Sequence, residues 1–219
     1  LTAEGVLGVI LLGKADEVKA AAKETGFNID KCQIIDPEQY ADIDAMVDEM
    51  VTLRKGKMTP EQVRDALSKS NYFGTMLVKM GKADCLLGGA TYSTADTVRP
   101  ALQLIKTKPG NKIVSSCFIM VKGDKKLAMG DCAINIAPNE DELAEIAIET
   151  AKTAKIFGID PKVAMLSYST YGSGKGEMVT LMANATKKVK EMAPDLDIDG
   201  ELQFCLLYTS PSPRDVEES

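Results

Sequence analysis

Four side chains that can donate hydrogen bonds to an oxyanion occur within one short stretch of the chain: Ser93, Thr94, Thr97 and Arg99. Arginine holds anionic groups through charge-assisted, often two-pronged hydrogen bonds. Ser93 and Asp96 have the spacing of a capping box, and helix starts present unpaired N–H groups and partial positive charge. The stretch therefore predicts an anion-binding site. A plain capped helix that binds nothing is an equally good interpretation of the local spacing.

The elements that must position these residues follow from apolar runs and turn residues. The run Ala83–Ala90 is short and apolar, which predicts a buried strand ended by Gly88 and Gly89. Residues 91–94 then form a hydroxyl-rich loop, and a helix follows. Pro100 leaves two alternatives open: a separate short helix before it, or a regular helix that begins at Pro100, where proline is tolerated.

The string STADTVRPALQ, from Ser93 to Gln103, closely resembles the signature of the phosphate acetyltransferase family. Other stretches that resemble the same family are NYFGTMLVKMGKAD before it, and GDCAIN and VAMLSYST after it. The resemblance extends from about Val6 to Gln203, which is nearly the whole chain. A match of this length is far more specific than any short motif.

The resemblance implies an enzyme that exchanges an acetyl group between acetyl phosphate and coenzyme A. The thiol would attack the acyl carbonyl directly, without a covalent acyl-enzyme. The implied fold is α/β, with two α/β domains and the active site in the cleft between them, in a three-layer sandwich like that of isocitrate and isopropylmalate dehydrogenases. Coenzyme A would be a co-substrate, no cofactor would be tightly bound, and the complete protein would be a homodimer.

The resemblance also assigns roles to individual residues. Arg99 would be the catalytic residue and would hold the phosphate of the acyl donor together with Thr94 and Thr97. Ser93, or Ser169 from the second domain, would donate a hydrogen bond to the developing oxyanion. All five would therefore contact the substrate.

Three further observations concern the rest of the reaction. Arg54 matches an arginine implicated in coenzyme A binding, although a basic residue at a helix C-terminus is also an ordinary dipole partner. The family's proposed base is an aspartate in a C-terminal segment with the string SRGCS, which does not occur in this chain. Tyr92 stands where the family commonly has histidine. We therefore expect the parent enzyme to be a transferase and this polypeptide to be inactive or nearly so.

Two alternative functions remain open at this point. Domains that resemble this family also occur as non-catalytic acetyl-CoA sensors fused to malic enzymes. A phosphate butyryltransferase is the other alternative, because the volume of the acyl pocket sets the chain length and cannot be derived from the sequence.

The composition excludes several other classes of protein. The 26 basic and 32 acidic side chains give a formal charge of −6, which disfavours nucleic acid and anionic membranes as partners. No apolar run approaches the length of a membrane span. The absence of histidine excludes Ser–His and Cys–His catalysis and His-ligated metals. Five cysteines without a CxxC pair favour a reducing, cytoplasmic setting.

No metal site is predicted. Residues 195–200 begin like a calcium-binding loop, but Leu206 stands where the loop needs a bidentate glutamate. The glycine-rich stretch 172–176 lacks the first glycine and the final hydroxyl of a nucleotide phosphate loop.

The turn-rich segment Lys106–Asn111 marks the expected domain boundary. We expect a partial first α/β domain over residues 1–108, a partial second α/β domain over 109–204, and a non-family tail over 205–219 that is artefactual or disordered. The chain lacks an initiating methionine, so we expect it to be a fragment of a longer protein.

Helical periodicity and capping residues predict helices near Ala15–Glu24, Tyr40–Arg54, Pro60–Ser68, Asn71–Met80, Asn139–Phe157 and Glu177–Met192. The helix at Pro60 should begin with a capping box, in which Thr59 is the N-cap and Gln62 follows three residues later. Apolar runs predict strands at Val6–Leu12, Cys32–Ile35, Ile113–Val121, Leu127–Gly130, Val163–Ser167 and Asp197–Gln203, the third and fourth forming a hairpin.

Overall fold

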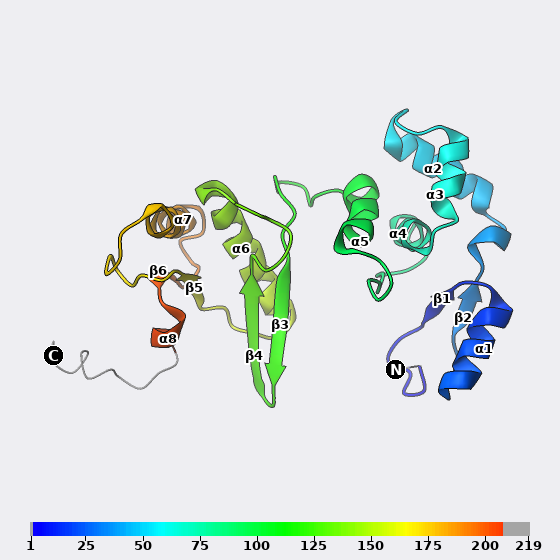
Figure 1. Ribbon diagram of the computed structural model, residues 1–219, viewed down its shortest axis with the longest axis horizontal. Helices are drawn as coiled ribbons and strands as arrows, with labels where there is room; N and C mark the ends of the chain where they lie inside the picture. Colours follow the sequence, from blue (N-terminus) through cyan, green and yellow to red (C-terminus); the bar gives the residue numbers. More distant parts are fainter. Residues whose placement is uncertain (1, 208–219) are drawn as a thin grey trace. The chain divides into compact units, whose positions relative to one another are not determined.

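The computed structural model describes residues 2–207, which have a mixed α/β composition with helices and three small sheets (Figure 1). The chain divides into two compact units, Leu1–Lys106 and Thr107–Ser219, and the division falls in the turn-rich segment noted above. Of the tail predicted over 205–219, residues 208–219 lie outside the described range. The dehydrogenase-like three-layer sandwich and its cleft remain predictions.

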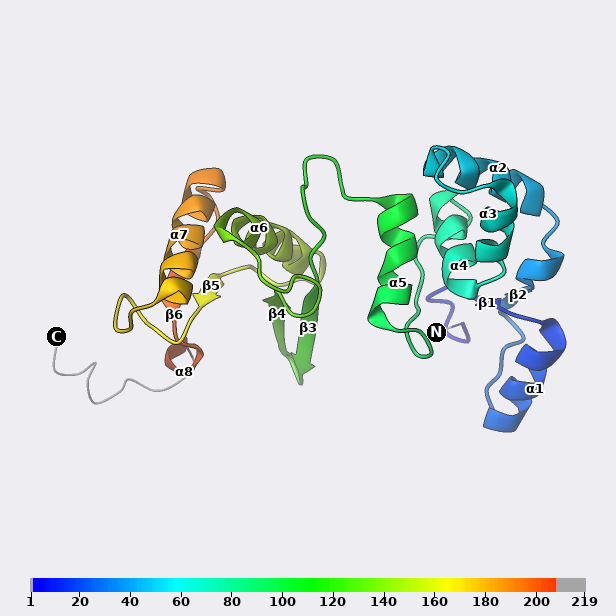
Figure 2. The ribbon, with the colours of Figure 1, turned by 45° about the horizontal axis from the view of Figure 1, so that its top comes forward.

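The first unit contains one parallel pair of strands and a group of helices (Figure 2). Its elements are β1 Ile10–Leu12, α1 Ala15–Thr25, β2 Gln33–Ile35, the 3₁₀ helix η1 Pro37–Gln39, α2 Ile43–Arg54, α3 Pro60–Leu67, α4 Ser70–Lys79, α5 Thr94–Pro100 and the π-helical turn η2 Ala101–Ile105. β1 pairs with β2 with Ile10 opposite Gln33. The capping box predicted at Thr59 is present, since Thr59 and Gln62 exchange side-chain-to-backbone hydrogen bonds.

The core of the first unit is built from the inward faces of α2, α3 and α4. Its fully buried large side chains are Met46, Met50, Val63, Leu67, Phe73, Met76 and Leu104. They recur at helical spacing, so each helix presents one apolar face to the others. Leu104 belongs to η2, and its burial in this core fixes the end of the α5–η2 helix against α2 and α4.

Two strand predictions in the first unit are wrong in extent or in kind. The strand expected over Val6–Leu12 is limited to Ile10–Leu12 and is half-buried. The run Ala83–Ala90 is not a strand but an exposed, irregular segment, and Leu87 is 97% exposed. A strand needs a neighbour for its backbone hydrogen bonds, and within residues 2–207 this run has none. Two residues of the run approach the core: Ala83 packs against it, and Leu86 lies over Gly74, close to Leu12.

The structure settles the two alternatives around Pro100. The helix begins at Thr94 and continues through Pro100 into the π-helical turn η2, which closes with a hydrogen bond from the Lys106 N–H to the Ala101 carbonyl of 2.9 Å. Proline has no N–H to give to the preceding turn, and helices commonly adjust locally around such a residue. The residues from Ser93 to Gln103 therefore lie on one continuous helical segment.

The second unit combines a hairpin, a parallel strand pair and two long helices. Its elements are β3 Cys117–Lys122, β4 Lys125–Gly130, α6 Glu140–Ile156, β5 Val163–Leu166, α7 Glu177–Met192, β6 Ile198–Leu202 and α8 Phe204–Leu207. The predicted hairpin is confirmed, with β3 and β4 antiparallel, and β5 pairs with β6 in parallel. Its core cluster comprises Leu143, Ala144, Ala147, Met165, Ala185, Val189 and Ile198. In the described part of the chain, no helix has the length and apolar character of a membrane span.

Candidate functional site

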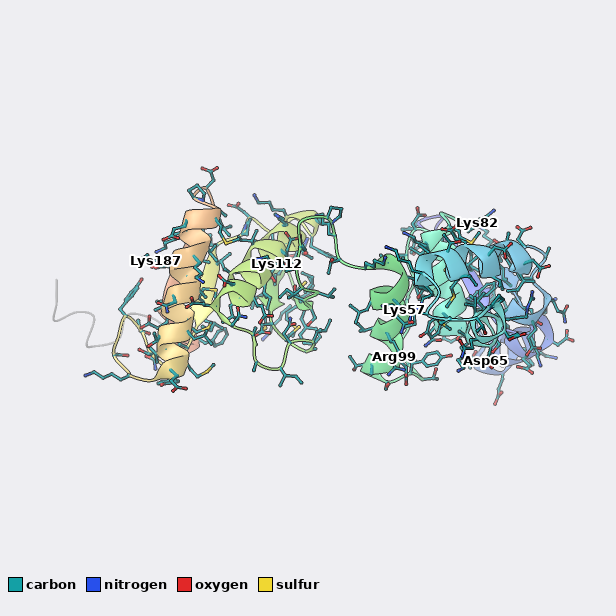
Figure 3. The ribbon with its side chains drawn as sticks, turned by 90° about the horizontal axis from the view of Figure 1, so that it is seen from above. Lys57, Asp65, Lys82, Arg99, Lys112 and Lys187 are labelled. Carbon is teal, nitrogen blue, oxygen red and sulfur yellow. The ribbon has the colours of Figure 1, made fainter. Side chains whose placement is uncertain are left out.

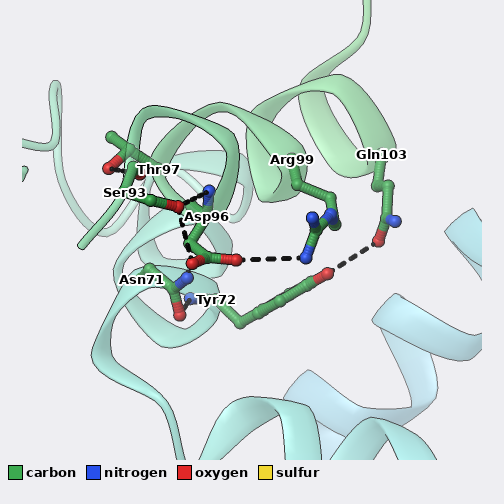
Figure 4. Close-up of polar contacts among 7 residues, drawn as sticks. All are labelled: Asn71, Tyr72, Ser93, Asp96, Thr97, Arg99 and Gln103. Atoms are coloured by element: carbon green, nitrogen blue, oxygen red, sulfur yellow. Dashed lines mark hydrogen bonds and ion pairs between the residues drawn. The ribbon is translucent and has the colours of Figure 1, made fainter.

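The first turn of α5 is held by a reciprocal cap between Ser93 and Asp96. The Asp96 N–H donates to Ser93 Oγ at 3.2 Å, and Ser93 Oγ donates to Asp96 Oδ2 at 2.7 Å. The capping residue predicted from the sequence is therefore confirmed (Figure 4). In this arrangement the Ser93 hydroxyl already donates its hydrogen bond to Asp96, so it is not available to a ligand.

The second carboxylate oxygen of Asp96 accepts a hydrogen bond from Arg99. Arg99 Nη1 lies 3.1 Å from Asp96 Oδ1, and Figure 4 shows the guanidinium directed back toward the first turn. The two side chains are 54% and 47% exposed, and Arg99 is labelled on α5 in Figure 3. Exposed ion pairs of this kind contribute about 0–1 kcal/mol. An anionic ligand could therefore take the place of Asp96 at little cost.

The two threonines of the stretch differ in their availability. Thr97 Oγ1 donates to the Ser93 carbonyl at 3.0 Å, so its proton is used within the helix. Thr94 is exposed at the first helical position, and no described residue forms a hydrogen bond with its hydroxyl. The side-chain donors of this stretch that remain free to reach a ligand are thus the outer N–H groups of Arg99 and the Thr94 hydroxyl.

α4 supports this helix through a buried asparagine that the sequence reasoning missed. Asn71 Nδ2 donates to the Asp96 carbonyl at 2.8 Å, and Asn71 Oδ1 accepts from the Tyr72 N–H at 2.9 Å. In a regular α-helix the Asp96 carbonyl would accept from the N–H four residues later. That residue is Pro100, which has no N–H. Asn71 supplies the hydrogen bond that Pro100 cannot.

A second contact from α4 reaches the next turn. Tyr72 Oη donates to Gln103 Oε1 at 3.0 Å, across 31 residues of sequence. Asn71 and Tyr72 are neighbours in sequence, and together they hold both the start and the middle of the α5–η2 segment (Figure 4). The position of Arg99 therefore depends on α4 as well as on its own helix.

We expect Asn71→Ala to lower the free energy of unfolding by about 1–3 kcal/mol, because it leaves the Asp96 carbonyl without its partner. Urea denaturation measures this loss. Pro100→Ala restores an N–H at the position that should serve Asp96, so the double variant should lose less than the sum of the two single changes. Strict additivity of the two losses in unfolding free energy would contradict the role of Asn71 as the donor that replaces the missing N–H of Pro100.

Arg54 occupies the last position of α2 and is half-buried. Its Nε is buried and has no hydrogen-bond partner among the described residues. A buried donor without a partner costs about 1–3 kcal/mol, more when it is charged, so such groups call for an explanation. A ligand that accepts from Arg54 would provide one.

Ser169 belongs to the second unit and is completely buried. Its hydroxyl donates to Glu201 Oε1 at 3.3 Å and accepts from the Gly174 N–H at 2.9 Å. Glu201 is also buried, and its carboxylate accepts from the Gly172 N–H at 2.6 Å. Through these hydrogen bonds, Ser169 and Glu201 hold the glycine-rich loop between β5 and α7 against β6. Ser169 belongs to the second unit, whereas the Ser93–Arg99 stretch belongs to the first.

The Glu201 carboxylate gives the second unit a predicted pH dependence. The Gly172 N–H is the main reason that the pKa of Glu201 lies below its ordinary value. Because the pKa of this carboxylate is lower in the folded state, its ionisation stabilises the folded protein at pH values above the unfolded-state pKa, about 4.3. This stabilisation is lost as the pH falls through the folded-state pKa. We expect Glu201→Gln to cost roughly 1 kcal/mol near neutral pH.

The same substitution should flatten the acid-side loss of stability in urea denaturation curves recorded from about pH 7 down to pH 3. The control is Glu24→Gln, an exposed carboxylate on α1. An unchanged acid slope in Glu201→Gln would contradict the assignment.

Comparison with known proteins identifies the family. A family profile described as "Phosphate acetyl/butaryl transferase" matches residues 1–206. The chain belongs to this family. The match covers both units, and it includes the Ser93–Gln103 segment whose geometry is described above.

Relatives in the phosphate acetyl/butaryl transferase family are close in sequence and in structure. The chain is 52% identical over 204 residues to a phosphate acetyltransferase of Bacillus subtilis, covering 93% of this chain and 63% of the relative. A phosphate acetyltransferase of Staphylococcus epidermidis is 51% identical over 200 residues, covering 89% and 61%. A phosphotransacetylase structure from Streptococcus pyogenes matches with a TM-score of 0.86 at 50% identity, covering 98% and 65%. The chain thus spans less than two thirds of these relatives' length.

Sequence reasoning found the family through Ser93–Gln103 but missed the support that α4 gives to that segment. The motif NYFGTMLVKMGKAD contains Asn71 and Tyr72, and the presence of a proline four residues after Asp96 was the available signal that a side chain must satisfy that carbonyl. No group of three or more histidine, cysteine, aspartate or glutamate side chains suited to a metal ion occurs among residues 2–207.

Proposed function

We propose that the complete protein transfers an acetyl group between acetyl phosphate and coenzyme A, and that Arg99 holds the phosphate of the acyl donor. The observation that carries this proposal is the position of Arg99. Its side chain is exposed on a helix that α4 supports, and among the described residues it pairs only with Asp96, in a weak surface ion pair. The named activity of relatives at about half identity adds support.

The reaction places clear demands on such an arginine. The thiol sulfur forms a bond to the acetyl carbonyl carbon, the carbon–oxygen bond to phosphate then breaks, and phosphate leaves with the bonding electrons. Negative charge grows first on the carbonyl oxygen and then on the leaving phosphate. Arg99 and the free Thr94 hydroxyl suit the phosphate because charge-assisted hydrogen bonds are the strong ones. Ser93, Thr97 and Ser169 could join the site only after releasing the hydrogen bonds they make here.

Arg54 is the second cationic group in the proposal. We assign it to coenzyme A, whose phosphates offer acceptors for the buried, unpaired Nε. Arginine suits this role better than lysine because its planar fork matches phosphate oxygens. The proposal predicts that coenzyme A, but not acetyl phosphate, loses affinity in Arg54→Ala.

The general base is the missing part of the proposed mechanism. The resemblance implies that the base is an aspartate near the string SRGCS, and this string is absent from the 219 residues. We therefore propose that this chain binds acetyl phosphate but turns it over slowly or not at all. The resemblance to the family separately leads us to propose that the complete protein acts as a homodimer.

The test is an assay of acetyl-CoA formation from acetyl phosphate and coenzyme A, with a binding measurement on the same preparation. Binding of acetyl phosphate by the 219-residue chain, with turnover far below that of the Bacillus subtilis relative, is the expected result. Butyryl phosphate in a parallel arm tests the alternative acyl preference. Binding of acetyl-CoA alone, without affinity for acetyl phosphate, would instead favour the acetyl-CoA-sensing alternative.

A further inference from the structure

The exposed segment that leads into α5 contains one residue that is partly buried. Of residues 84–95, only Tyr92 is not exposed to solvent. The Tyr92 hydroxyl lies 3.0 Å from Ser70 Oγ, across 22 residues of sequence, and either oxygen can be the donor. Ser70 is the first residue of α4. A side chain just before α5 is therefore hydrogen-bonded to the start of α4.

This contact extends the support that α4 gives to the site. Asn71 bonds to the Asp96 carbonyl, and Tyr72 bonds to Gln103. Ser70, the preceding residue, bonds to the segment just before the same helix. Three consecutive residues of α4 thus hold the entry, the first turn and a later turn of the α5–η2 segment.

The entry is the point at which a free donor is placed. Thr94 follows Tyr92 by two residues, is exposed, and opens α5. The Ser93–Asp96 cap holds the first turn from within α5, whereas Tyr92 holds the start of α5 from α4. A donor whose backbone is already fixed loses less conformational freedom when it binds, so its ligand binds more tightly.

We propose that Tyr92 is a positioning residue for the acyl donor: its hydrogen bond to Ser70 fixes the start of α5, so that Thr94 presents its hydroxyl to the phosphate together with Arg99. This inference rests on the proposed function, because it concerns the same phosphate. Tyr92 acts through Ser70 and does not itself touch the ligand.

Calorimetric titration with acetyl phosphate tests the proposal through both partners of the bond. Tyr92→Phe and Ser70→Ala each remove one hydroxyl and should each weaken binding about 2- to 12-fold, the fold-change that one hydrogen bond corresponds to. The double variant should bind within about twofold of either single variant, because both changes remove the same bond.

Two further variants separate positioning from general damage to the fold. Ser70→Thr keeps the hydroxyl and should retain the affinity of the wild type within about twofold. Tyr40→Phe removes the hydroxyl of another half-buried tyrosine of the first unit and should also bind normally. Circular dichroism confirms that each variant is folded, and the two independent routes to loss of the bond keep the test decisive if one variant does not fold.

The outcomes distinguish this role from the proposed function. Absence of acetyl phosphate binding in the wild type would overturn the proposed function. Unchanged affinity in Ser70→Ala, beside a weakened Arg99→Ala, would overturn the positioning role alone, as would a loss confined to Tyr92→Phe, since Tyr92 would then contact the ligand directly.

Hydrogen exchange without ligand tests the same hydrogen bond independently of any binding. The amides of residues 89–94 should exchange at least about threefold faster in Tyr92→Phe and in Ser70→Ala than in the wild type. Unchanged exchange in both variants would overturn the proposal, because the bond would then not fix the start of α5.

Discussion

Replacing Arg99 by alanine is expected to weaken the binding of acetyl phosphate by about 10- to 150-fold. Hydrogen bonds to charged groups contribute about 1.5–3 kcal/mol, and 1.4 kcal/mol corresponds to a factor of ten in affinity. The fold should be little affected, because the side chain is 54% exposed and its ion pair with Asp96 contributes little. Isothermal titration calorimetry with acetyl phosphate measures the effect.

Arg64 provides a matched control for this experiment. It is also 54% exposed and also pairs with an aspartate, Asp44, but it lies on α3. Arg64→Ala removes the same charge and should leave the affinity for acetyl phosphate within about twofold, since exposed charges that do not touch the ligand are screened by salt. Arg99→Lys keeps the charge without the planar fork of the guanidinium group. Its affinity for acetyl phosphate should lie between those of the wild type and of Arg99→Ala. Equal losses in Arg64→Ala and Arg99→Ala would show that only net charge matters.

Replacing Phe73 by alanine is expected to lower the free energy of unfolding of the first unit by about 3–5 kcal/mol. Phe73 is completely buried at the centre of the core, and its ring meets that of Tyr40 edge to face with centroids 5.2 Å apart. Truncation removes the apolar contacts, leaves a cavity and removes the aromatic pair. Urea denaturation followed by far-ultraviolet circular dichroism measures the loss.

The matched control for Phe73 is Phe118, which lies on β3 and is 53% exposed. Phe118→Ala should change stability by no more than about 0.5 kcal/mol, as surface substitutions usually do. Phe73 lies on α4 directly after Asn71 and Tyr72, the two residues that support α5, so Phe73→Ala should also weaken acetyl phosphate binding. A destabilised variant with unaltered affinity would show that α4 does not position Arg99.

The helices were predictable because their signals are local. α3 begins after Thr59 with the predicted capping box, and α7 has the predicted bounds, Glu177–Met192. Capping residues, helical periodicity and a following proline or glycine all act within a few residues of the helix they define. The hairpin of β3 and β4 was predictable for the same reason, because its strands are joined by a short turn.

The strand predicted at Ala83–Ala90 failed because pairing is not a local property. The apolar run indicates what the segment would bury but not which neighbour would bury it. The supporting contacts of the site were missed for a related reason. The bond from Asn71 to Asp96 spans 25 residues, and that from Ser169 to Glu201 spans 32. Ser169 was expected to reach the substrate from its motif, whereas its burial and its bond to Glu201 depend on β6.

The most direct test of the proposed role of Arg99 is a two-dimensional amide NMR titration of the 219-residue chain with acetyl phosphate. If Arg99 holds the phosphate, the largest chemical-shift changes will fall on the amides of Ser93–Gln103 and on the Arg99 side-chain N–H groups, and they will be absent in Arg99→Ala. Equal changes in Arg99→Ala, or changes centred elsewhere in the chain, would contradict this role.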